Sequence, residues 1–287
     1  MNRSAPRPLL SGYAAVAAAA AAWGTIGLAS RRIFAAGLGP LDAAAWRATS
    51  AFVILLIYCL LRERAALRIR AADILLFAAY GAVSVAGFMT VYFTAIALTT
   101  VAAAAVLLYT APAWVVLLAR PFFGEPVTRM KAAAVTLVFA GCALVVGLGP
   151  AAARLNPVGV LAGLGAGLTY GLYSIFGKVA LRRHSPLTTA VYSLGFGALF
   201  LLVASRGLAP VQAAGAWALA YVIAVPTVAA YLLYIAGLRR VEAGRASVVA
   251  TVEPVVAALT GSLMLHEPFG LTQWMGAALV LAGVMLV

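Results

Sequence analysis

The sequence predicts an all-α polytopic membrane protein, and its composition and the length of its apolar stretches lead to that fold class. Of the 287 residues, 65% are hydrophobic and 9% are charged, whereas a soluble domain is nearer half apolar and a quarter charged. The apolar stretches continue for about 20 residues, the length that a helix needs to cross a bilayer. They lack the alternation of a membrane barrel strand, so helices remain as the elements that satisfy their backbone groups in lipid.

Ten transmembrane helices can be placed along the chain. They cover residues 10–30, 40–61, 73–96, 101–119, 130–149, 157–177, 187–205, 213–236, 246–264 and 269–287. The apolar run of the first span extends from Leu9 to Ser30, which is longer than the roughly 7–15 residues of a signal-peptide core. We therefore expect the first span to remain in the mature protein.

Basic residues fall mainly on one side of these spans. One set of alternate loops holds 15 of the 20 Lys and Arg residues: Arg3, Arg7, Arg62, Arg64, Arg68, Arg70, Arg120, Arg129, Lys131, Lys178, Arg182, Arg183, Arg239, Arg240 and Arg245. The other set holds Arg31, Arg32, Arg154 and Arg206, and only Arg47 lies within a span. Cytoplasmic loops are rich in Lys and Arg, so the sequence predicts that both termini are cytoplasmic. The net charge of +13 is then a topology signal, and we expect membrane lipid and no nucleic acid as a partner.

The sequence repeats itself. At a shift of 142 residues, "VLLYTAPAWVVL" (106–117) aligns with "VVATVEPVVAAL" (248–259), so that Pro112 falls on Pro254. A looser match at a shift of 147 places "AWGTIG" near residue 22 on "TYGLYS" near residue 169. The chain therefore divides into two repeats, 1–150 and 151–287, of five spans each. Because five is odd, the second repeat enters the membrane from the opposite side.

Inverted repeats of this kind are typical of secondary transporters, whose substrate sites lie near the bilayer midplane between the repeats. Counted along the spans, Pro112 and Glu253 lie roughly 12–17 Å deep in a core about 30 Å thick. A proline cannot bond to the carbonyl four residues earlier, which is that of Leu108 for Pro112 and of Ala250 for Pro254. We expect both helices to break there and both prolines to serve in gating or to line a central cavity. A tolerated packing kink is the alternative interpretation.

Glu253 is a carboxylate predicted to lie near the midplane, where insertion costs about 2.5–3.5 kcal/mol. Its repeat mate is Ala111, so the fold itself does not require an acid at this place. Three interpretations remain: a protonated carboxyl bonded to a freed carbonyl, a partner of a cation such as Arg47, or a group in a wet cavity. We favour the cavity, where Glu253 would meet substrate or carry a proton.

Aromatic and hydroxyl side chains at similar depth are the other candidates for the cavity lining. Thr227, Tyr231 and Tyr234 share one helical face by their spacing of four and seven residues. The full set of candidates is Trp23, Tyr92, Tyr109, Trp114, Tyr170, Tyr173, Ser174, Thr227, Tyr231, Tyr234 and Glu253. Each single aromatic residue also has the simpler interpretation of a core or membrane-interface residue.

Several other features have structural interpretations. The glycines at 159, 163, 167 and 171 recur at every fourth residue of the sixth span, which favours close helix packing. Glu125-Pro126 and Glu267-Pro268 precede the fifth and tenth spans, where an acid suits the exposed amides of a helix start. Lys178 is expected to extend from the sixth span toward the membrane surface.

The sequence offers no pattern for a cofactor, a metal or an enzyme. Cys59 and Cys142 fall within spans, and the two histidines, His184 and His266, fall on opposite sides of the membrane. Neither pair has the spacing of a metal site or a disulfide framework. The sequence contains no HExxH, GxSxG or Walker A motif, so we expect no cofactor, no metal and no enzymatic activity.

Taken together, these features resemble the drug/metabolite transporter superfamily in its EamA-type, ten-helix branch. The resemblance rests on the two repeats, the "AP" and "EP" pairs at 111–112 and 253–254, and the "GEP" and "HEP" segments at 124–126 and 266–268. More narrowly, the chain is similar to YddG-type amino-acid exporters of bacterial inner membranes. The resemblance implies that spans one to four and six to nine surround a central cavity, with spans five and ten outside. It also implies export or exchange of aromatic and neutral amino acids or related metabolites.

The sequence therefore predicts a secondary transporter that works by alternating access on a small-molecule substrate, with protons as a further partner if Glu253 carries them. Three alternatives stay open. The first is a broad-specificity exporter of lipophilic cations or drugs with Glu253 as counter-charge. The second is a passive channel, and the third is an enzyme or assembly protein without flux.

Overall fold

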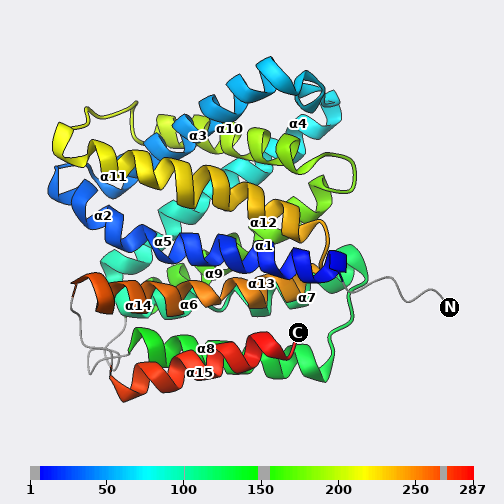
Figure 1. The fold of residues 1–287 in the computed structure, drawn as a ribbon, viewed down its shortest axis with the longest axis vertical. Helices are drawn as coiled ribbons and strands as arrows, with labels where there is room; N and C mark the ends of the chain where they lie inside the picture. The colour runs from blue at the N-terminus through cyan, green and yellow to red at the C-terminus, as the bar shows by residue number, and fades with distance from the viewer. Residues whose placement is uncertain (1–6, 100, 148–155, 266–269) are drawn as a thin grey trace.

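The computed structural model describes residues 7–99, 101–147, 156–265 and 270–287, and these residues form helices and connecting turns without a strand. The helices lie side by side in one bundle (Figure 1). The first half contains α1 (Arg7–Gly24), α2 (Ile26–Ala35), α3 (Pro40–Arg62), η1 (Arg64–Leu67), α4 (Ala71–Gly81), η2 (Ala82–Gly87), α5 (Phe88–Leu98), α6 (Val101–Leu108), α7 (Ala111–Phe123) and α8 (Arg129–Val146). The second half contains α9 (Pro157–Ala180), α10 (Pro186–Ala204), α11 (Ala213–Ile223), η4 (Ala224–Ala229), α12 (Ala230–Leu238), α13 (Ala243–Ala250), α14 (Val252–Leu265) and α15 (Leu271–Met285).

Several of these helices join into longer membrane spans. Within the described residues, nine spans are long and apolar enough to cross a membrane, and α15 is a shorter apolar helix of 15 residues. The first, third, fourth, eighth and ninth spans consist of α1–α2, α4–η2–α5, α6–α7, α11–η4–α12 and α13–α14. The prediction of an all-α polytopic membrane protein is confirmed.

The packing of α8 against α15 shows the inverted relation of the two halves. The two helices form a pair at one edge of the bundle, outside the other spans (Figure 1). A Cβ atom added to Gly141 or to Gly276 would lie 2.7 Å from the carbonyl oxygen of the other, and one on Gly283 would lie 2.9 Å from that of Ala134. A shift of 142 residues converts the first contact into the second with the roles exchanged. The helices are therefore antiparallel and related by approximate twofold symmetry.

Irregular turns also occur at equivalent places in the two halves. The fourth span breaks after Leu108 and the ninth after Ala250, as the prolines predicted. Two π-helical turns, η2 at 82–87 and η4 at 224–229, again lie 142 residues apart. Such turns displace a helical register by one residue and are frequent at functional sites.

Glycines allow the first and sixth spans to cross these breaks closely. A Cβ atom on Gly24 would lie 2.7 Å from the carbonyl oxygen of Glu253, and one on Gly171 would lie 3.1 Å from that of Ala111. Of the other glycines in the sixth-span series, Gly159 packs against Leu98 at the end of α5, and the next two pack against α6 and the turn that follows it. The predicted close packing of this series is confirmed.

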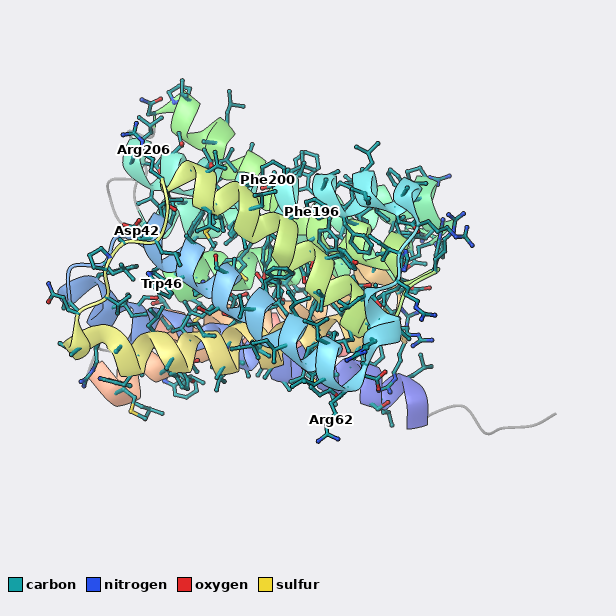
Figure 2. All side chains as sticks on the ribbon, turned by 90° about the horizontal axis from the view of Figure 1, so that it is seen from above. Asp42, Trp46, Arg62, Phe196, Phe200 and Arg206 are labelled. Atoms are coloured by element: carbon teal, nitrogen blue, oxygen red, sulfur yellow. The ribbon has the colours of Figure 1, made fainter. Side chains whose placement is uncertain are left out.

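The two ends of the bundle differ in charge. We call the end with loops 62–71, 123–129, 180–186 and 238–243 the arginine-rich end; the loops 35–40 and 204–213 belong to the opposite end. Figure 2 shows Asp42 and Arg206 near one end and Arg62 toward the other. At the arginine-rich end, the Tyr13 hydroxyl of α1 donates to the carbonyl of Val287, just beyond the end of α15, at 3.1 Å. The predicted repeat boundary at 150/151 and the Glu267-Pro268 pair lie outside the described residues.

Candidate functional site

A cavity of about 570 Å³ lies between the two halves of the bundle. Its lining begins at Phe34, Pro40 and Val101, which are exposed at the end opposite the arginine-rich end. It extends to Trp23 and Glu253 in the middle of the first and ninth spans. The cavity is therefore open toward one end of the bundle and has its floor near mid-depth.

Glu253 lies at the floor of this cavity because the ninth span breaks immediately before it. The helix α13 ends at Ala250, and Glu253 occupies the first turn of α14. The Tyr170 hydroxyl donates a hydrogen bond of 3.0 Å to Glu253 Oε2. A carboxylate that accepts from a neutral hydroxyl keeps lone pairs for a further partner.

Aromatic rings surround the floor. Trp23 makes edge-to-face contact with Tyr231 at 5.9 Å and with Tyr170 at 6.5 Å between ring centroids. Tyr231 in turn meets Tyr173 edge-to-face at 5.3 Å. Ring pairs of this geometry hold one another in place, so the floor has a rigid aromatic wall.

Arg47 supplies a positive charge to the same cavity, and a chain of hydrogen bonds positions it. Pro226 within η4 has no N–H, so it cannot bond to the carbonyl of Val222 four residues earlier. The Thr227 hydroxyl donates to that carbonyl at 2.7 Å and accepts from Arg47 Nε at 3.2 Å. Arg47 and Glu253 are the lining residues with ionisable side chains of opposite type, so one guanidinium and one carboxyl group face the same space.

A second, much smaller cavity continues from Glu253 toward the arginine-rich end. Its volume is about 20 Å³, which is space for about one water molecule. Ser174 and Tyr234 line it and share a hydrogen bond of 2.6 Å, and Ser247 and Thr251 add further hydroxyls. The path beyond the floor is thus narrow and lined by hydroxyl groups.

Most of the sequence-predicted site residues come together around these two cavities. The larger cavity is lined by Trp23, Tyr92, Tyr109, Tyr170, Tyr173, Tyr231 and Glu253, and the smaller one adds Pro112, Ser174 and Tyr234. Thr227 is buried behind Arg47.

Trp114 and Pro254 line neither cavity. The indole N–H of Trp114 is buried without a hydrogen-bond partner among the described residues. Pro254 is buried in the first turn of α14. Ser84, Thr251 and Ser247 line the cavities but were absent from the predicted set; the hydroxyls of 247 and 251 precede Glu253 at short spacing, which is the signal that could have suggested them.

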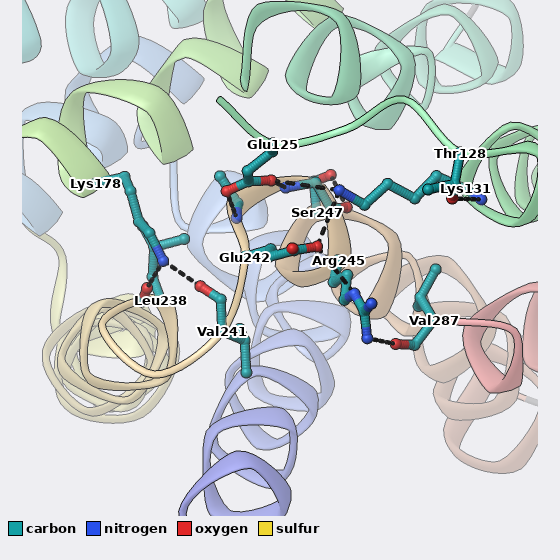
Figure 3. Close-up of polar contacts among 12 residues, drawn as sticks. Glu125, Thr128, Lys131, Lys178, Leu238, Val241, Glu242, Arg245, Ser247 and Val287 are labelled. Carbon is teal, nitrogen blue, oxygen red and sulfur yellow. Dashed lines mark hydrogen bonds and ion pairs between the residues drawn. The ribbon is translucent and has the colours of Figure 1, made fainter. Parts of the chain in front are cut away.

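Beyond the smaller cavity, the arginine-rich end is closed by an ion cluster formed by Glu125, Lys131, Glu242 and Arg245 (Figure 3). Glu125 accepts backbone N–H bonds from Ala243 at 2.7 Å and Gly244 at 3.1 Å, at the start of α13. Lys131 Nζ lies 3.7 Å from Glu125 Oε2 and 2.9 Å from Glu242 Oε2. The side chains of Glu125 and Lys131 are 7% and 4% exposed, so these two residues of the first half make buried contacts to the start of α13 and to Glu242 in the second half.

The expectation that Glu125 stabilises the start of its own following span is wrong. Gly124 adopts the left-handed conformation with φ 70°, which turns the chain at the end of α7. Glu125 then reaches across to α13. The start of α8 is instead capped by Thr128, whose hydroxyl accepts from the Lys131 N–H at 3.2 Å.

Glu242 and Arg245 connect the ion cluster to the end of α15. Arg245 donates from Nε to Glu242 Oε2 at 2.9 Å and from Nη1 to the carbonyl of Val287 at 2.9 Å. Burial alone would raise the pKa of Glu242, but the hydrogen bond and charge of Lys131 and the charge of Arg245 outweigh it. The pKa of this carboxyl therefore lies below its usual value.

Lys178 also takes part in closing this end. It donates to the carbonyl of Leu238 at 2.9 Å and to the carbonyl of Val241. The expectation that it extends to the membrane surface is wrong, because the last turn of α12 leaves carbonyl oxygens without helical partners and a cation satisfies them. Lys178 thus ties the sixth span to the eighth.

Two inverted five-helix repeats with a mid-depth cavity between them define a membrane transporter of the inverted-repeat class. The chain belongs to the EamA-like transporter family, which matches residues 10–147 and 157–287. The resemblance stated from the sequence is confirmed, and the protein is a multi-pass membrane transporter.

Individual relatives agree with this assignment. An uncharacterized transporter of Archaeoglobus fulgidus is 35% identical over 206 residues, covering 71% of this chain and 73% of its own. The uncharacterized inner membrane transporter YicL of Salmonella typhimurium is 26% identical over 215 residues, covering 71% and 70%. A probable terminal-alkyne amino-acid exporter of Streptantibioticus cattleyicolor is 27% identical over 188 residues, covering 64% and 63%. A crystal structure with 20% sequence identity has a TM-score of 0.81 and covers 99% of this chain and 98% of its own, which shows the same fold.

Proposed function

We propose that this protein exports or exchanges aromatic and other neutral amino acids, or related metabolites, across the inner membrane of a bacterium by alternating access. The observation that supports this proposal is that Arg47 and Glu253 line the same cavity together with aromatic rings. A free amino acid is a zwitterion, so it presents an anion and a cation together. An apolar pocket with a few convergent polar groups is the usual form of a small-molecule site.

Each end of the zwitterion has a chemically suited partner in the cavity. A guanidinium can bind a carboxylate through two parallel hydrogen bonds, which makes Arg47 the candidate for the α-carboxylate. Glu253 retains acceptor capacity beyond its bond from Tyr170, so it is the candidate for the α-ammonium. The rings of Trp23 and Tyr231 offer an apolar surface for the substrate side chain.

The state of the two ends supports alternating access. With the arginine-rich end in the cytoplasm, as its charge favours, the cavity is open to the outside and the ion cluster closes the inner end. Loading from the cytoplasm then requires the Glu125 bonds to α13 to break and the opposite end to close. The inverted repeats favour a second arrangement of comparable energy, because equivalent contacts recur with exchanged roles.

Lipophilic cations are a second candidate class of substrate, for which Glu253 would act as the counter-charge. Arg47 argues against this class, because a like charge in the same cavity repels a cation. The relative described as a probable terminal-alkyne amino-acid exporter also supports an amino-acid cargo for this chain.

Transport by the purified protein in liposomes tests the proposal. We expect saturable uptake of labelled phenylalanine and counterflow driven by unlabelled phenylalanine. N-acetyl-phenylalanine, which lacks the ammonium, and phenylalanine amide, which lacks the carboxylate, should both compete poorly.

Competition by tetraphenylphosphonium stronger than that by phenylalanine would instead support the cation exporter. Flux that does not saturate and shows no counterflow would support a channel. No flux of any of these solutes, with the fold intact by circular dichroism, would contradict the proposal.

A further inference from the structure

A groove of about 830 Å³ lies away from the central cavity, at the arginine-rich end. It is bounded by α3, the turn η1, the loop before α10, and the segment from η4 through α12. Ile54 and Tyr58 of α3 line it and are 46% and 49% exposed. In a membrane-spanning bundle, exposed residues on the middle and end of a helix face lipid, so the groove opens to the bilayer.

The two parts of the groove differ in chemistry. The part within the membrane spans is apolar and includes Ile54, Val228 and Leu232. The part at the end of the bundle carries Arg68 and Arg183, both exposed. An apolar groove that ends in cationic groups at the membrane surface is complementary to an acyl chain joined to an anionic headgroup.

The surrounding charge is strongly positive despite one acid in the lining. Residues 62–70 contain four arginines and one glutamate, Glu63, and the neighbouring loop adds Arg182 and Arg183. Arg183 Nη1 lies 4.0 Å from Asp73 Oδ1, and His184 Nε2 lies 3.2 Å from Asp73 Oδ2. Asp73 is buried and is not part of the groove lining, so it anchors this loop while Arg183 stays at the groove.

We propose that this groove binds an anionic phospholipid, with the phosphodiester at Arg68 and Arg183 and an acyl chain along Ile54, Val228 and Leu232. Basic pockets between transmembrane helices at a membrane surface bind anionic lipid headgroups. Val228 and Leu232 are direct neighbours of Thr227 and Tyr231 in the chain, so the lipid would contact the eighth span, whose Thr227 accepts a hydrogen bond from Arg47. The lipid is a partner distinct from the transported solute, and the inference does not depend on the proposed function.

Native mass spectrometry of the detergent-purified full chain tests the inference. The protein is titrated with phosphatidylglycerol and with phosphatidylcholine that carry the same acyl chains. We expect wild type to bind phosphatidylglycerol at least about tenfold more tightly, and the double variant Arg68→Gln/Arg183→Gln to lose most of that preference. Both arginines are exposed, and Asp73 keeps its contact with His184 in the double variant, so the double variant should remain folded, which its unfolding temperature checks.

Two further variants make the test specific to the groove. Arg62→Gln is the matched control, because Arg62 is exposed at the same end but is not part of the groove lining; it should keep the wild-type preference. Glu63→Gln removes the acid of the lining and should strengthen phosphatidylglycerol binding.

Three outcomes would overturn the inference. Equal affinity of wild type for the two lipids would show that the groove does not select an anionic headgroup. An equal loss in Arg62→Gln would show a diffuse surface charge instead of a groove. Displacement of the lipid by soluble glycerol phosphate at similar concentration would show that the arginines bind phosphate without the acyl chain.

Discussion

The fourth and ninth spans occupy equivalent places in the two repeats, but of the two only the ninth places an ionisable side chain in the cavity lining. Both break at the same position, after Leu108 and after Ala250, and a glycine of a crossing span packs on each break. The residue before the proline is Ala111 in the first repeat and Glu253 in the second. The symmetric parts therefore build the scaffold, and the departures from symmetry place the charged groups.

The same contrast holds for the third and eighth spans and for the first and sixth. Thr227 and Tyr231 of the eighth span align with Val85 and Met89 of the third, so the hydroxyl that holds Arg47 exists in one repeat only. The first span breaks at Thr25, whereas α9 runs without a break from Pro157 to Ala180. These departures from symmetry lie at or next to the cavity lining.

Neutralising the charged pair should have the largest effect. Glu253→Gln and Arg47→Gln each remove one charge-assisted bond to a zwitterion, which is worth about 1.5–3 kcal/mol, so we expect uptake of labelled phenylalanine in liposomes to fall by roughly 10–100-fold. The two repeats provide the matched control: Ala111→Ser adds a polar atom at the mate of Glu253 and should retain uptake within about threefold. If Ala111→Ser were as damaging as Glu253→Gln, the distinction between scaffold and site would fail.

Opening the closed end should have the next largest effect. Glu125→Gln removes the charge from a buried carboxylate that accepts from two amides of α13, and a hydrogen bond to a charged group is worth about 1.5–3 kcal/mol. A cysteine at Ser247, which lines the smaller cavity, should then react at least about tenfold faster with a thiol reagent added at the arginine-rich side.

The control for this labelling is Arg239→Gln, which removes an exposed charge at the same end and should leave the rate unchanged. The chain without the cysteine at 247 gives the background, because Cys59 and Cys142 are both buried. Unchanged labelling in Glu125→Gln would show that this contact does not hold the end closed.

Adding a methyl group at the two helix crossings sharpens the comparison of the repeats. A Cβ atom on Gly24 would meet both the Glu253 carbonyl oxygen and Val256 Cβ at 2.7 Å, whereas one on Gly171 would have 3.1 Å to its nearest neighbours. We expect Gly24→Ala to lower the unfolding temperature by more than Gly171→Ala, with a cost of about 1–3 kcal/mol for the former. Gly27→Ala, where nothing lies within 4 Å, is the control and should change little. The reverse order would contradict the asymmetry of the crossings.

Local chemistry explains which of these features the sequence could predict. The breaks after Leu108 and Ala250 follow from the missing N–H of a proline, and the inversion follows from counting spans. Both features could therefore be predicted from the sequence. The turn η4 has a proline of its own, Pro226, as a local signal, but η2 (AVSVAG) has none.

The contacts that join the repeats could not be predicted in the same way. Arg47 bonds to Thr227, which lies 180 residues away in the sequence, and Glu125 bonds to Ala243, which lies 118 residues away. Such pairs depend on how spans face one another, which one sequence does not specify. Spacing alone could select residues at the right depth, but it could not separate Trp114 from the aromatic residues that line the cavity.

Acidification should weaken the ion cluster through Glu242, with the smallest effect of the four. Its pKa is lowered in the folded protein by Lys131 and Arg245, so its stabilising contribution is present above the pKa of the unfolded chain, about 4.3. That contribution is lost as pH falls through the lower folded-state value. Because Glu242 is 37% exposed, solvent screening keeps the contribution small. The difference in unfolding temperature between wild type and Glu242→Gln should therefore be present at neutral pH and shrink below about pH 4.3. A difference that grew on acidification would mean that Glu242 is not held in its charged form by the cluster.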